Sequence, residues 1–140
     1  MIPRLINEII IHCTDTPPRC DIGIKEIDVW HRQKGWDEIG YHIVIRLDGT
    51  IEFGRAINKV GAHCKGQNSY SIGICYVGGQ DAFGNRCDTR TPQQKEALAI
   101  LLDFLTRALP ITKIHGHKYY NDKKLCPCFD VESEYAHFLL

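Results

Sequence analysis

Short apolar stretches separated by turn signals predict five strands along the chain. Residues 8–14 include three consecutive isoleucines, and "SIGICYVGG" (71–79) is closed by two glycines. Apolar runs of this length predict strands that are buried on both faces. "YHIVIRLDGTIEFGR" (41–55) predicts two strands around Asp48-Gly49, a dipeptide that favours a tight hairpin. "ITKIHG" (111–116) is short and β-branched, so it predicts a fifth strand.

Apolar residues at helical spacing predict three helices. Residues 24–34 form the first, and Gly35 ends it. "TPQQ" (91–94) begins the second, because Thr91 can cap it, proline suits the first helical position and Gln94 can complete a capping box. Asp130 can cap the third. The spaced residues are Ile24, Ile27, Trp30 and His31; then Leu98, Leu101, Leu102, Leu105 and Leu109, up to Pro110; and finally Val131, Tyr135 and Phe138.

The order of these elements, β-α-β-β-β-α-β-α, predicts an α/β fold. Its central β-sheet should be mixed and flanked by helices. A length of 140 residues suits one domain with one core, so we expect residues 1–140 to form a single domain.

Composition and charge exclude several classes of partner. The formal net charge is zero, so there is no global basic field that would favour nucleic acid. No segment approaches the roughly 20 apolar residues that cross a bilayer, so we expect no membrane partner. The first ten residues are interrupted by Asn7 and Glu8, unlike a signal peptide. We therefore expect synthesis in the cytoplasm.

The seven cysteines do not resemble a secreted disulfide framework, because their number is odd and their spacing irregular. Most are expected to be buried or idle thiols. At least one is a candidate metal ligand.

Polar residues that bind metals follow the predicted strands in three places. They are His12 after the first strand, "HGH" (115–117) after the last, and "CPC" (126–128) shortly afterwards. Ligand sites in open α/β sheets gather at strand ends. Zinc binds imidazole nitrogen and thiolate sulfur, and a catalytic zinc site has three protein ligands with the fourth position open to water. One residue from each place would complete such a set.

Two plainer interpretations remain open on spacing alone. A single histidine at a strand end is usually a hydrogen-bonded polar residue without a metal. The "HGH" and "CPC" pairs could instead form a closed structural zinc site with four local ligands.

Six stretches, in order, resemble the zinc N-acetylmuramoyl-L-alanine amidases of the type-2 family. This family includes the short phage amidases called lysozymes and the animal peptidoglycan recognition proteins. The likeness runs from residue 9 to residue 131. The stretches are "IIIHCTDT", "GWDEIGYHIVIRLDGTIEFGR", "VGAHCKGQN", "SIGICYVGG", "TPQQ" and "GHKYYNDKKLCPCFDV".

The resemblance implies a ligand set and two further active-site residues. By position, His12, His117 and Cys126 match the zinc ligands of the family. Tyr41 matches its active-site tyrosine and Lys124 its active-site lysine. The recycling amidases of the family carry aspartate as third ligand, so Cys126 argues against that branch. The non-catalytic recognition proteins lack the cysteine, so its presence favours hydrolysis.

The sequence departs from the family in the loop before this cysteine. The loop from His117 to Cys126 is about one residue longer than in the relatives it resembles most, and Lys123 stands beside Lys124. Cys128 occupies a position where relatives often carry a small residue. Lys123 is therefore a rival candidate for the role given to Lys124, and Cys128 for the role given to Cys126.

The implied reaction is hydrolysis of the amide between the lactyl group of N-acetylmuramic acid and L-alanine in peptidoglycan. We expect a monomeric endolysin that acts on the cell wall after its release. The alternatives are a cytosolic amidase that recycles muropeptides, and a regulatory protein related to the phage lysozymes that inhibit a polymerase.

For the substrate groove we expect Trp36, Arg55, His63 and Asn68, with Lys65 and Gln67 nearby; the alternative is a solvated polar loop. We expect His31, His42 and His137 to be structural.

Overall fold

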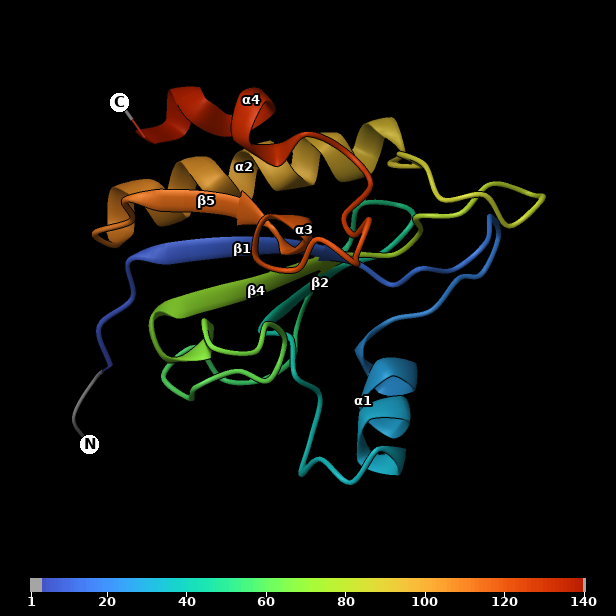
Figure 1. Ribbon diagram of the computed structural model, residues 1–140, viewed down its shortest axis with the longest axis horizontal. Coiled ribbons are helices and arrows are strands. Elements are labelled where there is room, and N and C mark those ends of the chain that lie inside the picture. Colours follow the sequence, from blue (N-terminus) through green and yellow to red (C-terminus); the bar gives the residue numbers. More distant parts are fainter. Residues whose placement is uncertain (1–3, 140) are drawn as a thin grey trace.

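The structure, a computed structural model, describes residues 4–139, and at its centre is a sheet of five strands (Figure 1). The strands are β1 (Glu8–Cys13), β2 (Ile43–Ile45), β3 (Ile51–Phe53), β4 (Ser71–Tyr76) and β5 (Lys113–Gly116). Their spatial order is β3-β2-β4-β1-β5. β3 runs antiparallel to β2, and the other neighbours pair in parallel, so the sheet is mixed as the sequence predicts.

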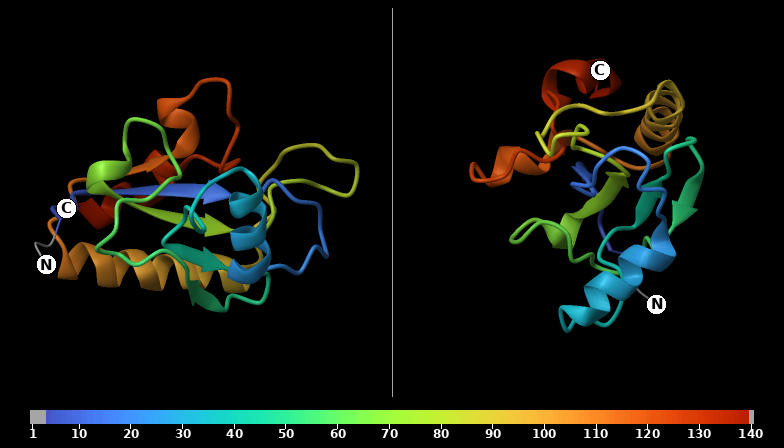
Figure 2. Two further views of the ribbon diagram at one scale, coloured as in Figure 1. Left: turned by 90° about the horizontal axis from the view of Figure 1, so that it is seen from below. Right: turned by 90° about the vertical axis from the view of Figure 1, so that its right-hand side faces the viewer.

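Helices cover both faces of the sheet. The α-helices are α1 (Ile24–Gln33), α2 (Pro92–Ala108), α3 (His117–Tyr120) and α4 (Val131–Tyr135), and short 3-10 helices span Asn68–Tyr70 and Ala136–Leu139. Figures 1 and 2 show α2 and α4 on one face and α1 on the other. The predicted fold class is confirmed, and α3 is an additional short element that the sequence pattern does not predict.

The two faces bury separate apolar clusters because side chains alternate along a strand. Ile9 and Ile11 of β1 face the larger cluster, which includes the buried leucines of α2. Val44 of β2 and Cys75 of β4 face the smaller cluster under α1. β1 and β4 are buried along their whole length, as their continuous apolar runs predict.

Helix α2 begins with the predicted capping box. The Thr91 hydroxyl accepts a hydrogen bond from the Gln94 N–H at 3.1 Å, and the Gln94 side chain accepts one from the Thr91 N–H at 2.9 Å. In α1 the buried stripe is narrower than the pattern suggests. Ile27 and His31 are buried, whereas Trp30 lies at the edge of the stripe with 40% of its surface exposed.

Each of the seven cysteines is a free thiol. Within residues 4–139, no helix is long and apolar enough to cross a membrane. The strand ends that carry the candidate chemistry meet at one edge of the sheet, because β1, β4 and β5 are parallel.

Candidate metal centre and active-site cavity

His12, His117 and Cys126 come together at the carboxyl edge of the sheet. Each offers one ligand atom, and these atoms all lie within 4.8 Å of one another. His12 is near the end of β1, and His117 is the first residue of α3, directly after β5. The parallel pairing of β1 with β5 therefore brings both histidines to the same edge.

Cys126 reaches this edge from a loop that is attached to both strands. The Cys13 N–H donates a hydrogen bond to the Cys126 sulfur at 3.1 Å. The Lys118 N–H donates to the Cys126 carbonyl oxygen at 2.8 Å. The cysteine is thus positioned by the residue that follows His12 and by the residue that follows His117.

Both histidines are electrostatically suited to bind a metal as neutral imidazoles. Burial holds the pKa of His12 well below its usual range, with His63 and His117 contributing in the same direction. Burial and the Lys124 ammonium lower the pKa of His117. Because a metal binds the unprotonated nitrogen, these shifts keep the two ligands available near neutral pH.

The rival ligands lie outside this group. The Cys128 sulfur is 3.9 Å from that of Cys13 and 3.6 Å from the Gly79 carbonyl oxygen. The His115 ring stacks on Tyr119 with centroids 3.7 Å apart. Among residues 4–139, the cluster able to hold a metal contains neither of them, which favours the long-range site over a closed local one.

Tyr41 lies beside His12. Its ring centroid is 5.1 Å from that of His12, and its carbonyl oxygen accepts a hydrogen bond from the Arg55 N–H at 2.9 Å. Burial, followed by the neighbouring thiols of Cys75 and Cys126, raises the pKa of Tyr41 well above its usual range. The phenol therefore keeps its proton at neutral pH.

A cavity of about 570 Å³ opens beside this group. His117, Cys126 and Tyr41 line it, together with Lys123 and Lys124. Both lysines are exposed, but the charge of Lys124 is the one that acts on His117. The further lining residues are Cys13, Thr14, Asp15, His31, Lys34, Trp36, Ala62, His63, Arg86, Leu125 and Cys128.

Two of the four residues expected in the substrate groove line the cavity. Trp36 is 37% exposed, and the Lys34 ammonium lies 5.4 Å from its ring centroid. His63 is only 8% exposed, and its Nδ1 is 2.8 Å from Nε2 of His12. Trp36 thus has surface to offer a ligand, whereas His63 has very little.

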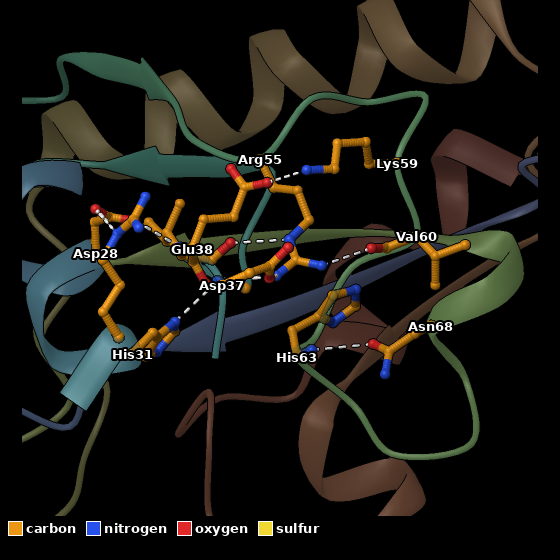
Figure 3. A network of polar contacts seen from close by, with 12 residues as sticks. Asp28, His31, Asp37, Glu38, Arg55, Lys59, Val60, His63 and Asn68 are labelled. Carbon is orange, nitrogen blue, oxygen red and sulfur yellow. Dashed lines mark hydrogen bonds and ion pairs between the residues drawn. The ribbon is translucent and has the colours of Figure 1, made fainter. Parts of the chain in front are cut away.

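Arg55 is placed away from the cavity lining, as the centre of a polar network (Figure 3). Its Nε donates to the Ile39 carbonyl oxygen at 3.0 Å, its Nη1 to that of Val60 at 2.8 Å, and its Nη2 to Asp37 at 3.1 Å. The guanidinium therefore joins the segment before Tyr41 to the segment before His63.

Asn68 also supports the site from outside the cavity lining. Its side-chain oxygen accepts hydrogen bonds from the N–H groups of His63 and Cys64, each at 3.0 Å (Figure 3). Lys65 and Gln67 of the same loop are likewise absent from the lining. The loop that the sequence suggests as a groove wall thus contributes mainly His63.

Several lining residues are not predicted by the sequence pattern. Asp15 and Arg86, which both line the cavity, form an ion pair at 2.9 Å, and Arg86 comes from an exposed loop whose sequence carries no motif. His31 lines the cavity, yet its Nδ1 accepts a hydrogen bond from the Gly40 N–H at 2.8 Å. His42 likewise accepts one from the Gly73 N–H at 3.0 Å. The structural role expected for these two histidines is consistent with these bonds.

Comparisons with known proteins give the class to which the fold and site belong. The family model described as N-acetylmuramoyl-L-alanine amidase matches residues 3–129. The endolysin of Enterobacteria phage K11 is 44% identical over 126 residues, which are 90% of this chain and 83% of that protein. The chain belongs to the N-acetylmuramoyl-L-alanine amidase family, as the sequence resemblance indicates. It is an enzyme of that activity.

Solved structures agree with this assignment. The N-acetylmuramoyl-L-alanine amidase LysC from Clostridium intestinale URNW superposes with a TM-score of 0.82 at 34% identity, covering 96% of this chain and 85% of that one. The Drosophila peptidoglycan recognition protein PGRP-LB gives a TM-score of 0.77 at 27% identity, covering 97% of this chain and 82% of that one. The fold is therefore shared by amidases and recognition proteins.

Proposed function

We propose that this chain is a zinc-dependent endolysin that cleaves the amide bond between the lactyl group of N-acetylmuramic acid and L-alanine. His12, His117 and Cys126 hold the ion, and Tyr41 and Lys124 act on the reacting groups. The observation that carries the proposal is the convergence of the three ligand atoms within 4.8 Å beside a cavity that His117, Cys126, Tyr41 and Lys124 line.

The donor set suits zinc. Two neutral imidazoles and one thiolate would match the three-ligand composition of catalytic zinc sites. When bound, zinc polarises a carbonyl group and makes water nucleophilic near neutral pH. The remaining chemistry falls to the side chains around it.

Lys124 is proposed to stabilise the charge that develops on the carbonyl oxygen. Attack on an amide converts its carbonyl into a tetrahedral centre with negative charge on oxygen. A cationic donor at the cavity wall favours that state over the neutral substrate. One positioned donor of this kind typically contributes about 3 kcal/mol to the transition state.

Tyr41 is proposed to orient the attacking water. Its raised pKa keeps the hydroxyl protonated, so the group offers one hydrogen and accepts another at the same oxygen. Because its ring lies beside that of His12 and lines the cavity, Tyr41 can hold water in line with the scissile carbonyl and help to move its proton.

The cavity suits a glycopeptide substrate. Lys34, Arg86, Lys123 and Lys124 surround it against the single carboxylate of Asp15, and Trp36 offers an apolar face. Peptidoglycan carries hydroxyl, amide and carboxylate groups that can bind to these lining side chains. We propose that the enzyme works as a monomer on the cell wall after release from the cytoplasm, without a nucleic acid or membrane partner.

Digestion of purified peptidoglycan tests the proposal. The expected products are new alanine amino groups without new reducing sugars. A glycosidase would need a pair of carboxylates flanking the scissile bond, and new reducing ends would overturn the amidase mechanism. Intact cell walls and soluble muropeptides should be compared, because a recycling amidase would act on the soluble fragments alone.

A further inference from the structure

Both ring nitrogens of His63 are already engaged within the protein. Nδ1 lies 2.8 Å from Nε2 of His12, and Nε2 lies 3.3 Å from the hydroxyl oxygen of Ser71. The side chain is nearly buried although it touches the cavity. His63 therefore has no free nitrogen with which to bind a substrate.

The directions of these hydrogen bonds follow from Ser71. Its hydroxyl donates to the Gln67 carbonyl oxygen at 2.7 Å, and a hydroxyl has only one hydrogen to donate. Towards His63 the Ser71 oxygen must therefore accept, so the proton of the neutral His63 ring is on Nε2. Nδ1 of His63 is then an acceptor, and Nε2 of His12 must be the donor. A neutral imidazole has one N–H, so Nδ1 of His12 is left with a free lone pair.

The ring of His63 is also held in place by close packing. A Cβ atom added to Gly73 of β4 would lie 2.6 Å from the His63 ring, and one added to Gly61 would lie at the same distance. Asn68 fixes the backbone of His63 from the other side (Figure 3). The glycine within the otherwise apolar run of β4 thus leaves space for this imidazole.

We propose that His63 is a positioning residue of the metal centre: the chain His12–His63–Ser71–Gln67 fixes His12 in the tautomer that presents Nδ1 to the metal. This inference rests on the proposed zinc site and gives His63 a role other than substrate contact. Metal-binding histidines usually donate their second ring N–H to a fixed acceptor, and loss of that acceptor weakens metal binding. Here the acceptor is a second histidine, whose own tautomer is set by a serine.

We call the hydrogen-bonded series His12–His63–Ser71–Gln67 the relay. Zinc affinity, measured by competition with a chelator, tests the relay independently of catalysis. His63→Ala should weaken zinc binding about 10- to 100-fold. His63→Asn retains an oxygen acceptor near the position of Nδ1 and should recover part of that loss. Ser71→Ala should also weaken binding, although Ser71 is buried and does not line the cavity. Ser69→Ala, at an exposed neighbouring position, is the matched control and should bind zinc as the wild type does.

Gly73→Ala probes the same relay from the sheet. The added methyl group would displace the His63 ring without reaching the cavity, so zinc binding should weaken. In a His63→Ala background the same change should cause no further loss, because the displaced ring is already absent. Additive losses in this double-mutant cycle would contradict the relay.

Nitrogen-15 NMR of the imidazoles reads the tautomers directly. We expect Nε2–H on both His12 and His63, with Nδ1 of His12 shifted when zinc is added. A proton on Nδ1 of His12 would overturn the inference, and so would His63 variants that raise KM with unchanged zinc affinity. Failure of the wild-type protein to bind zinc would instead contradict the proposed function, while the tautomers of the metal-free protein still decide the relay.

Discussion

The Cys13 N–H donates a hydrogen bond to the Cys126 sulfur at 3.1 Å, which joins two positions 113 residues apart in the chain. Cys13 follows His12 directly, so this bond places the thiol ligand next to the first imidazole. The metal centre is therefore complete only when the C-terminal loop is docked on the end of β1. Metal binding and loop docking should stabilise each other, because a ligand set of this kind does not exist in the unfolded chain.

The two cysteines of the "CPC" stretch should differ sharply. Cys126→Ser should abolish tight zinc binding, because a neutral hydroxyl replaces the thiolate. Cys128→Ser is the matched control and should retain the metal, since its sulfur faces Cys13 and Gly79. Zinc content after gel filtration measures both. If the Cys126 variant retained zinc and the Cys128 variant lost it, Cys128 would be the metal ligand in place of Cys126.

Lys124 and Lys123 provide a second matched pair. Lys124→Ala should keep zinc but lose on the order of a hundredfold in kcat, because its contribution is greatest in the transition state. Lys123→Ala should be much milder. Steady-state kinetics on peptidoglycan compares them. If the Lys123 variant instead lost most of its kcat, Lys123 would be the catalytic lysine, and the assignment of the metal ligands would not change.

Arg55 should act through the loops it joins. Arg55→Met removes the donors of the buried Ile39 carbonyl and the part-buried Val60 carbonyl, and we expect a loss of about 3 kcal/mol in the free energy of unfolding. Arg107→Met removes an exposed ion pair with Asp103 and should cost below about 0.5 kcal/mol. Urea unfolding measures both. Unchanged stability together with a raised KM in the Arg55 variant would instead support the sequence-based prediction that Arg55 contacts the substrate.

Stability should fall in mild acid because of buried neutral histidines. Burial lowers the pKa of His31 and of His42 to about 4, from an ordinary value of 6.5. Between these values the unfolded chain binds more protons than the folded chain, so the free energy of unfolding decreases as the pH falls from about 6.5 to about 4. Urea midpoints across this range measure the slope. His42→Asn should make it shallower, and an unchanged slope would argue against this origin.

Much of the fold is readable from the sequence because its signals are local. The isoleucine run of β1, the Asp48-Gly49 hairpin and the "TPQQ" cap each specify their element through nearby residues. Helix α3 is missed because its four residues, His117–Tyr120, are too few to display a helical period. The exposure of Trp30 depends on how α1 lies against the sheet, which its own spacing does not determine.

The site is only partly readable, since it depends on long-range contacts. The residue types of His12, His117 and Cys126 suggest a metal, and the family resemblance selects them from their neighbours. Arg55 and Asn68 are polar residues near the motifs, but their donors and acceptors are used by the backbone. Arg86 enters the cavity wall through its pairing with Asp15, and only the folded chain displays that contact.

Removal and restoration of the metal tests the central claim most directly. The protein as purified should contain about one zinc per chain, and a strong chelator should abolish the release of alanine amino groups from peptidoglycan. Addition of about one equivalent of zinc should restore that activity in the wild type and leave the Cys126→Ser variant inactive. Full amidase activity in the demonstrably zinc-free wild-type protein would contradict the account.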